Sequence, residues 1–472
     1  MTTVREPTAC ELARDIAAGK VTTLEVTEAC LARIAADEPR VGAFAHLAPE
    51  HARGQARALD DRKHAGRPLG PLHGLPIAVK DIVDTTDFPT ENGSVLHAGR
   101  RPRRDAFIVS RLRAAGAVLL GKTVTTEFAC FTPGRTRNPH DLERTPGGSS
   151  SGSAASVAAG MVPLAIGSQT NGSVIRPASF CGVVGFKPSY GLIPRTGVLT
   201  TSATLDHLGV FARSVEDAAM LADALAGYDE DDLATRPAPP PALHRVALTP
   251  PPVTPRLAFV RGPTWDEAEP ATVEAFAELA ELLGGSLVAV ALPEPFADAV
   301  AVHRTIWTSE LAFHLAPEYE HGRTQLSDRL RHLIEAGLAT PAPAYQKALA
   351  TRRAYQASLD ALFHEFDAIV TPAAPGEAPL GLGATGSPAF CTLWSLVGTP
   401  AVTMPVLLGP AGLPLGVQLV GAIGDDARLL RTARWLAAHI AATTEEASRR
   451  APAFSRPSSA TCCSPCSRAS WR

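Results

Sequence analysis

The sequence predicts an α/β fold in which a large, mixed and twisted central β-sheet is covered by helices on both faces. Short apolar runs bounded by glycine or proline recur along the chain, which is typical of buried strands. Segments with apolar residues at helical spacing lie between these runs. The chain has 472 residues, of which 45% are hydrophobic, so it can bury an extensive core. Length alone does not decide whether the chain forms one large domain or about three.

The expected elements follow from these two patterns. Thr23 is the predicted cap of a first helix, and Asp105 is predicted to start a second helix whose apolar side carries Ile108, Val109 and Leu112. The predicted strands are residues 75–79, 117–120, 162–166, 183–186, 257–260, 287–290, 368–370, 401–404 and 417–420. Lys80 falls at the end of the first of these strands.

Two segments are expected to lie outside the sheet. Residues 236–256 contain eight prolines and follow an acidic run at 229–232, which predicts an extended surface connection. We interpret it as an elaborated surface loop, with a linker between domains as the alternative. Residues 456–472 are rich in serine, arginine and proline and contain Cys462, Cys463 and Cys466. A single CxxC pair gives too few ligands for a structural zinc site, so we expect a disordered tail.

The charge and hydropathy of the sequence limit which kinds of molecule the protein is expected to bind. The formal net charge is −3 and there is no long basic run, which argues against nucleic acid and anionic membranes. The N-terminus lacks the layout of a secretion signal, and no apolar stretch approaches the ~20 residues of a membrane span. The other five of the eight cysteines are scattered singly through apolar segments, as expected for reduced, buried thiols. We expect a cytoplasmic protein that acts on a small molecule, and a homodimer is left open.

The chemistry concentrates in residues 146–177. Ser149 follows Gly147 and Gly148, and Ser173 follows Gly172, with a segment of small residues between the two serines. Together with Lys80, this pattern resembles the amidase signature family, whose serine hydrolases use a Ser-cisSer-Lys triad. Family-like features extend over roughly residues 5–445, so residues 1–455 are interpreted as one amidase signature domain.

The resemblance implies a role for each of these residues. Ser173 would be the nucleophile, Ser149 would relay the proton from beside a cis peptide bond, and Lys80 would be the base. The backbone N–H groups of residues Thr170, Asn171, Gly172 and Ser173 would form the oxyanion hole. An ordinary lysine has a pKa of about 10.4 and is protonated at pH 7, so burial has to lower the pKa of Lys80 by about 3 units. We expect Asp81 to face away from Lys80.

This sequence differs from the usual pattern of the family at several positions near the two serines. Relatives commonly have an acidic residue where this chain has Gln169, and an arginine where it has Ile175, with Arg176 one step later. Ser151 also replaces a frequent glycine. The acid and the arginine support glutamine binding in the family's amidotransferases, so their loss favours a free-standing hydrolase. Arg176 is interpreted as a structural residue, with a substrate carboxylate as the alternative partner.

The predicted reaction is hydrolysis of a small carboxylic amide to a carboxylate and ammonia or an amine through an acyl-enzyme. Carbamates, aryl amides and esters remain alternatives, as do the A component of a glutamine-dependent amidotransferase, which would need partner chains, and a catalytically silent scaffold. Ser150 is a one-position alternative to Ser149. No cofactor and no metal are expected. The substrate pocket is predicted to use Phe128, Phe131, Gly148 and Trp307, with Phe313 as a further contributor, and the variable region about 240–345 is expected to shape it.

Overall fold

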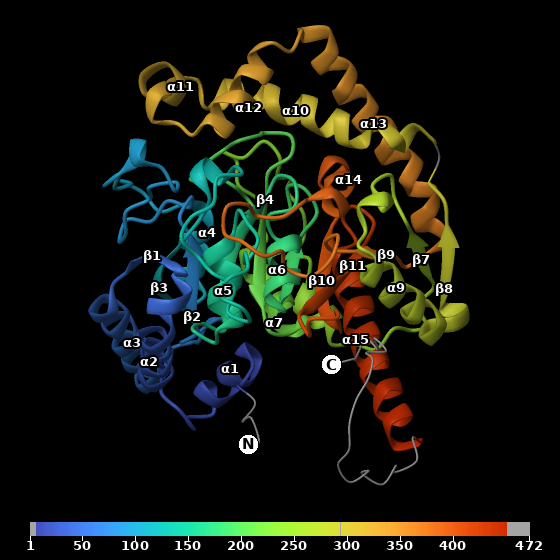
Figure 1. Ribbon diagram of the computed structural model, residues 1–472. Helices are drawn as coiled ribbons and strands as arrows, with labels where there is room; N and C mark the ends of the chain where they lie inside the picture. Colours follow the sequence, from blue (N-terminus) through green and yellow to red (C-terminus); the bar gives the residue numbers. More distant parts are fainter. Residues whose placement is uncertain (1–5, 293, 451–472) are drawn as a thin grey trace, which may run out of the picture.

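The computed structural model describes residues 6–292 and 294–450, and within them eleven strands form one mixed sheet (Figure 1). The order across the sheet is β1-β3-β2-β4-β6-β5-β10-β11-β9-β7-β8. The strands are β1 (Phe44–Leu47), β2 (Pro76–Lys80), β3 (Val118–Thr123), β4 (Leu164–Gln169), β5 (Val184–Lys187), β6 (His207–Ala212), β7 (Leu257–Val260), β8 (Leu287–Val290), β9 (Ala368–Pro372), β10 (Ala401–Leu408) and β11 (Pro414–Val420). The predicted α/β fold with a mixed sheet is confirmed.

All nine predicted strands are present, and two more were not predicted. In β1 the polar His46 interrupts the apolar run, and its ring contacts Glu91. In β6 the run is interrupted by Gly209, where an added Cβ would lie 2.8 Å from the carbonyl oxygen of Phe186. Both strands therefore lack the uninterrupted apolar run by which we recognised the others.

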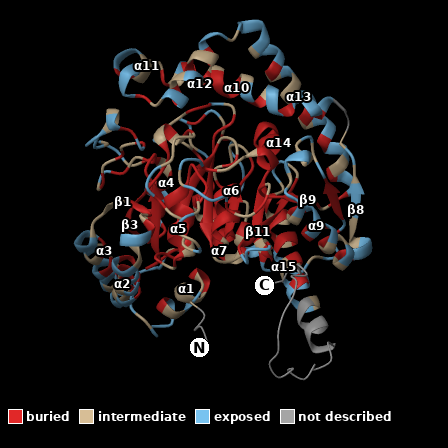
Figure 2. Ribbon diagram, in the orientation of Figure 1, coloured by how far each residue is buried: buried red, intermediate tan, exposed pale blue. Residues whose placement is uncertain are grey.

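Helices cover both faces of the sheet, and the buried residues lie between them and the strands (Figure 2). Helices α4, α7 and α15 contribute to the core on one face, and α2, α3, α5 and α6 contribute to the core on the other. The helices are α1 (Ala9–Ala17), α2 (Thr23–Val41), α3 (Pro49–His64), α4 (Phe107–Ala114), α5 (Ser151–Ala158), α6 (Ile175–Cys181), α7 (Val215–Leu225), α8 (Leu243–Ala247), α9 (Pro270–Leu283), α10 (Ala299–His314), α11 (Ala316–Gly322), α12 (Asp328–Leu338), α13 (Ala342–Glu365), α14 (Ala389–Val397) and α15 (Asp426–Arg450). Short 3-10 helices are η1 (Val95–His97), η2 (Glu127–Ala129), η3 (Trp265–Glu267), η4 (Gly284–Ser286), η5 (Glu294–Asp298) and η6 (Arg323–Gln325).

Three local predictions need correction. The cap of α2 is Thr22, whose hydroxyl accepts from the backbone N–H of Glu25, so Thr23 is already helical. Helix α4 begins at Phe107 rather than at Asp105, whose carboxylate instead accepts from the backbone of Thr86. The proline-rich loop near 236–256 is not extended throughout, because it contains α8, in which Leu243 is buried. The predicted tail at 456–472 lies outside the described residues.

A group of helices from the variable region forms a cap above the sheet. Helices α10, α11, α12 and α13 lie across the top of the molecule in Figure 1, with α14 below them. Residues of α10, α12, α13 and α14 share a core cluster that also includes Phe128 and Ile175. The cap is therefore packed directly onto the segments that carry the predicted chemistry.

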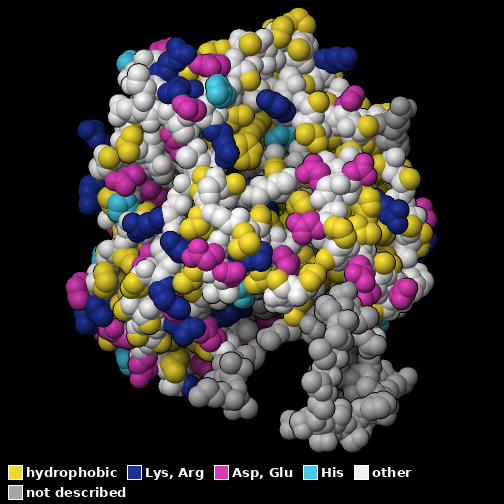
Figure 3. Space-filling model, in the orientation of Figure 1, with side chains coloured by type: hydrophobic (Ala, Val, Ile, Leu, Met, Phe, Trp, Pro, Cys, Tyr) yellow, Lys and Arg dark blue, Asp and Glu magenta, His cyan; other side chains and the backbone are white. Residues whose placement is uncertain are grey.

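The surface agrees with the sequence-based interpretation of charge. On the face shown in Figure 3, basic and acidic side chains are interspersed, and hydrophobic side chains gather in a hollow below the helices at the top. Within residues 6–292 and 294–450, we find no helix with the length and apolar content needed to cross a membrane. The cysteines at positions 10, 30, 130, 181 and 391 are buried and have free thiols, as predicted.

Candidate active site

Lys80 ends strand β2 and points its amine into the protein interior. Its neighbour strand β4 runs parallel, with Val79 opposite Ile166, and this register brings Lys80 beside Ser168. The Nζ atom donates hydrogen bonds to Ser149 Oγ at 2.7 Å and to Ser168 Oγ at 2.8 Å. Lys80 is completely buried. Its amine is thus held by two hydroxyl groups from different segments.

The surroundings of Lys80 favour its neutral form. Burial lowers the pKa of Lys80 to about 7, and the negative charge of Asp206 only partly opposes this shift. Across the part of the chain that the structure describes, no carboxylate forms an ion pair with Lys80. Asp81 faces elsewhere, as expected, because its carboxylate lies 3.1 Å from the Nζ of Lys122. A substantial fraction of Lys80 can therefore accept a proton near neutral pH.

Ser149 lies in the tight segment that precedes α5. The Gly148–Ser149 peptide bond is cis, and Ser149 is 3% exposed. Gly147 has a φ of +81°, and an added Cβ there would lie 2.8 Å from the Cα of Pro177 in α6. Glycine therefore allows this segment to approach α6 closely.

The neighbouring serines have different partners from Ser149. The hydroxyl of Ser150 lies 3.2 Å from both the backbone nitrogen and the backbone oxygen of Ser168. Ser151 donates to the carbonyl of Val124, and Ser153 donates to the carbonyl of Ile166. These hydroxyls satisfy backbone groups of the adjacent strands. Of Ser149 and Ser150, it is Ser149 that contacts Lys80.

Ser173 lies in the turn between β4 and α6, together with the residues predicted to form the oxyanion hole. The backbone N–H groups of Asn171, Gly172 and Ser173 donate to no residue that the structure describes, so they can donate to a ligand. Gln169 fixes the turn from behind, because its Oε1 accepts from the N–H groups of Val174 at 2.8 Å and Ile175 at 3.0 Å. The neutral amide of Gln169 thus caps α6.

Helices α10 and α14 hold the same turn. His303 of α10 lies with its Nε2 3.0 Å from the carbonyl oxygen of Thr170. In α14, Thr392 donates to the side-chain oxygen of Asn171 at 2.7 Å, and Ser395 donates to the Asn171 carbonyl. The asparagine that replaces a small residue therefore has its own hydrogen-bond partner. The turn is fixed from three sides.

Arg176 connects α6 to the segment that carries Ser149. Its Nη2 donates to the carbonyl oxygen of Gly148 at 2.6 Å and to the hydroxyl of Thr385 at 3.2 Å. Burial lowers its pKa to about 10, and no acidic residue among those described is ion-paired with it. Its Nε and Nη1 atoms are buried without a hydrogen-bond partner. The carbonyl contact agrees with a structural role, and the two remaining nitrogens keep the alternative of a ligand carboxylate open.

The predicted pocket residues divide into two groups. Phe131 and Trp307 contact each other edge to face with centroids 5.4 Å apart, and Gly148 lies beside Ser149. Phe128 is completely buried and its ring packs against His97. Phe313 is 77% exposed, so the expectation that it contributes to the pocket is wrong. Phe131 and Trp307 thus place an aromatic pair between η2 and the cap helix α10.

Sequence reasoning missed Ser168, Asp206 and His303. Ser168 lies two residues beyond the predicted strand at 162–166; β4 continues to Gln169, so the side chain of Ser168 is on the same face of the strand as that of Ile166. Asp206 accepts from the hydroxyls of Thr170 and Thr201, and it borders a cavity of about 20 Å³ that Ser168 also lines. That volume is about enough for one water molecule. Neither Asp206 nor His303 lies in a recognisable motif.

Comparisons with known proteins agree with the fold. The family model described as Amidase matches residues 25–430. The A component of the glutamyl-tRNA(Gln) amidotransferase of Chloroflexus aggregans is 37% identical over 455 residues, which cover 88% of this chain and 93% of the relative.

Solved structures give the same result. The peptide amidase of Stenotrophomonas maltophilia has a TM-score of 0.79 at 31% identity and covers 93% of this chain and 97% of its own. A chain from a vestigial protein complex, studied for the evolutionary origins of an s-triazine catabolic enzyme, has a TM-score of 0.85 at 33% identity. That match covers 91% of this chain and 98% of the other.

An α/β enzyme fold with a buried lysine and two glycine-flanked serines defines a class of hydrolase. The chain belongs to the amidase signature family. It is an enzyme that acts on amide C–N bonds.

Proposed function

We propose that this protein hydrolyses a small-molecule carboxylic amide through an acyl-enzyme on Ser173, with Ser149 as proton relay and Lys80 as base. The observation that carries the proposal is the 2.7 Å contact between Lys80 Nζ and Ser149 Oγ in a buried site without a paired carboxylate. A lysine in such a site can release and take up a proton near neutral pH. The amine, the relay hydroxyl and the cis peptide together match the arrangement expected of the family.

The proposed reaction begins when Ser173 Oγ attacks the substrate carbonyl. The proton of Ser173 passes to Ser149, whose own proton passes to neutral Lys80. The developing oxyanion accepts hydrogen bonds from the N–H groups of the turn at residues 170–173. Collapse of the tetrahedral intermediate breaks the C–N bond, and the proton returns through Ser149 to the leaving amine. Water then hydrolyses the acyl-enzyme by the same route.

We propose that the acyl part of the substrate binds in an apolar pocket. Phe131 and Trp307 supply an aromatic surface close to the turn, since Trp307 lies one helical turn beyond His303, which contacts Thr170. Such a surface favours aliphatic or aryl amides over charged ones. Carbamates and esters would pass through the same acyl-enzyme.

A second candidate function is that of the A component of an amidotransferase, favoured by the name of the Chloroflexus relative. In that case the chain would act with partner chains and would deliver ammonia. The neutral Gln169 and the apolar Ile175 argue against it, since relatives commonly carry an acid and an arginine there. We therefore propose a free-standing hydrolase that needs no nucleic acid, no membrane and no cofactor.

The first test is covalent labelling and a substrate screen with the purified chain. A fluorophosphonate should label wild-type protein and Ser150→Ala but not Ser173→Ala, because Ser150 contacts only backbone groups. Simple amides, anilides, carbamates and esters are then compared for turnover. Labelling that persists in Ser173→Ala would overturn the assignment of the nucleophile.

The second test separates hydrolase from amidotransferase. The purified chain is assayed with its best amide and with glutamine, alone and with added amidotransferase partner chains. We expect amide turnover by the chain alone and no stimulation of glutamine cleavage by the partners. Activity that appears only with glutamine and partner chains would establish the second candidate instead.

A further inference from the structure

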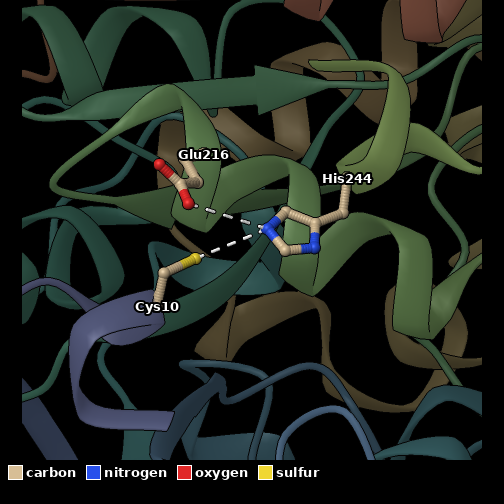
Figure 4. Close-up of side chains that lie close together, drawn as sticks. All are labelled: Cys10, Glu216 and His244. Atoms are coloured by element: carbon tan, nitrogen blue, oxygen red, sulfur yellow. Dashed lines mark hydrogen bonds and ion pairs between the residues drawn. The ribbon is translucent and has the colours of Figure 1, made fainter. Parts of the chain in front are cut away.

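Three metal-binding side chains meet where helices α1, α7 and α8 pack together, apart from the proposed active site. Cys10 comes from α1, Glu216 from α7 and His244 from α8, and their side chains point toward one another (Figure 4). Cys10 Sγ lies 3.6 Å from His244 Nε2, and Glu216 Oε1 lies 4.0 Å from the same nitrogen. All three candidate ligand atoms lie within 4.8 Å of one another.

These separations fit a tetrahedral zinc ion. With Zn–S near 2.3 Å and Zn–N near 2.0 Å, the sulfur and nitrogen ligands of one ion lie about 3.5 Å apart. The observed 3.6 Å between Cys10 and His244 already meets that requirement. With a Zn–O distance of ~2.1 Å, the oxygen and nitrogen ligands of one ion lie about 3.4 Å apart. Glu216 Oε1 is 4.0 Å from His244 Nε2, so the oxygen would have to move about half an ångström closer to that nitrogen. Met220 adds a second sulfur, 3.7 Å from Cys10 Sγ.

The charges around the cluster call for a cation. Among the residues with described side chains, neither Glu216 nor Asp217 forms an ion pair with a lysine or arginine, and the ion-pair partner of Glu216 is His244. One oxygen of Asp217 accepts from the backbone of Cys10, while the other is buried without a partner. Arg14 lines the same cavity and donates from Nε to the carbonyl oxygen of Cys10 at 3.2 Å, but it forms no ion pair with either carboxylate. Two carboxylates beside a thiol are unfavourable in a partly buried site unless a positive charge compensates them.

The cluster also has access to solvent. A cavity of about 500 Å³ is lined by Cys10, Glu216, Met220 and His244, together with parts of α1 and residues 69–71 and 73. It offers a route by which an ion could enter and room for a water molecule as the fourth ligand. Three protein ligands with an open position are a frequent arrangement for zinc.

We propose that Cys10, Glu216 and His244 bind one zinc ion, which ties α1 to α7 and α8. Binding replaces the thiol proton of Cys10, which leaves to solvent. No local pattern in the sequence indicated such a site, because the ligands come from three distant positions. The expectation of a metal-free protein is revised to this extent, while the chemistry proposed for Ser173 needs no metal.

A second cluster of suitable residues does not carry the same inference. His46, Asp81 and Glu91 also lie close together. There, however, the ammonium group of Lys122 lies 3.1 Å from Asp81 and already supplies the positive charge. A cation at that position would be repelled by the lysine.

The test is metal binding by the full-length chain. Cys462, Cys463 and Cys466 are first replaced by serine, since the C-terminal CxxC pair can itself bind zinc. After removal of metal with a chelator, the protein is dialysed against zinc, and the bound metal and the zinc affinity are measured. Cobalt is then used as a spectroscopic substitute that reports thiolate ligation.

We expect about one zinc ion per chain and a thiolate-to-cobalt absorption band. Cys10→Ser and His244→Gln should each weaken zinc binding by roughly 100-fold or more and remove or weaken that band. Cys30→Ser is the matched control, because Cys30 is a buried thiol without a neighbouring histidine, and it should bind zinc normally. Amide turnover should be similar in all three variants.

Two outcomes would overturn the proposal. One is the absence of stoichiometric zinc binding in the tail-substituted protein. The other is undiminished binding in His244→Gln, a substitution at a partly exposed position whose fold is checked by circular dichroism. If Cys10→Ser fails to fold, the zinc affinities of His244→Gln and Glu216→Gln test the proposal instead.

Discussion

Lys80 and Lys122 are both fully buried and lie on the adjacent strands β2 and β3, yet their surroundings differ in one respect. Lys122 lies 3.1 Å from the carboxylate of Asp81, whereas the hydrogen bonds of Lys80 to described residues go to the hydroxyls of Ser149 and Ser168. Burial lowers the pKa of both lysines, but for Lys122 the attraction of Asp81 opposes the shift. The comparison teaches that burial alone does not produce a base; the paired carboxylate has to be absent as well.

The largest expected effect is on the activity of Lys80 variants. Lys80→Met should lower kcat/KM by roughly 10²–10⁴-fold, because the proposed base is removed. The free energy of unfolding should stay the same or rise, since no paired charge is left behind. Steady-state kinetics and chemical denaturation measure the two quantities. A variant that retains wild-type turnover would break the comparison at its central point.

The second effect is on the stability of Lys122 variants. Lys122→Met should reduce the free energy of unfolding by about 3–5 kcal/mol, because Asp81 is left buried without its partner. Adding Asp81→Asn should restore part of that loss. Urea denaturation of the single and double variants provides the measurement. Equal stability losses in Lys80→Met and Lys122→Met would mean that the two lysines do not differ as described.

The third expected effect is the pH dependence of kcat/KM, which tests whether Lys80 loses its proton near neutral pH. With a folded-state pKa of about 7 for Lys80, kcat/KM should rise with pH and level off above pH 7. Below that value it should fall by about tenfold per pH unit. A pH–rate profile without this acid limb would argue against Lys80 as the base.

Stability should depend on pH in the same direction. Between pH 7 and 10.5 the unfolded chain keeps a proton on Lys80 that the folded chain has lost. The unfolded state therefore binds more protons, and stability should increase with pH over this window by up to about 1.4 kcal/mol per unit. Lys187, whose pKa burial also lowers to about 7, adds a similar slope. The contribution of Lys80 is obtained by measuring the free energy of unfolding against pH for wild type and for Lys80→Met and taking the difference between the two slopes.

The smallest expected effect concerns Arg176, a buried cation that, like Lys80, forms no ion pair with any acidic residue that the structure describes. Arg176→Met removes the hydrogen bond to the Gly148 carbonyl, which is worth about 1.5–3 kcal/mol when the donor is charged. We expect kcat to fall by roughly 10–100-fold with KM little changed, because Ser149 is then less well positioned. Arg176→Lys should recover part of the activity. If KM for carboxylate-bearing substrates rises instead, Arg176 binds the substrate.

Much of this arrangement could be predicted from the sequence. The apolar runs located nine of the strands, and the glycine-flanked serines located the segments that carry Ser149 and Ser173. Strands β1 and β6 escaped because His46 and Gly209 interrupt their patterns. Helix starts were displaced because a threonine or an aspartate near a helix is not always its cap, as Thr23 and Asp105 illustrate.

The partners of the site residues were harder to predict. Asp206 and His303 contact Thr170 in the turn at residues 170–173 through tertiary packing, and no local spacing reveals them. We predicted that Asp81 would face away from Lys80, but we did not predict that it would pair with Lys122. The zinc ligands proposed at positions 10, 216 and 244 were invisible for the same reason, because only folding brings them together.

The segments that hold Lys80, Ser149 and Ser173 all lie before β5, whereas α10–α13 come from residues 299–365 and reach the turn through His303. In the proposed mechanism, the residues that break the bond therefore come from the earlier stretch of the chain, while the later stretch adds Trp307 to the proposed pocket. Exchanging the later stretch for that of a relative should redirect which amides are accepted while the proton path stays intact. Such a division gives evolution, and the protein engineer, a place to alter preference without rebuilding the chemistry.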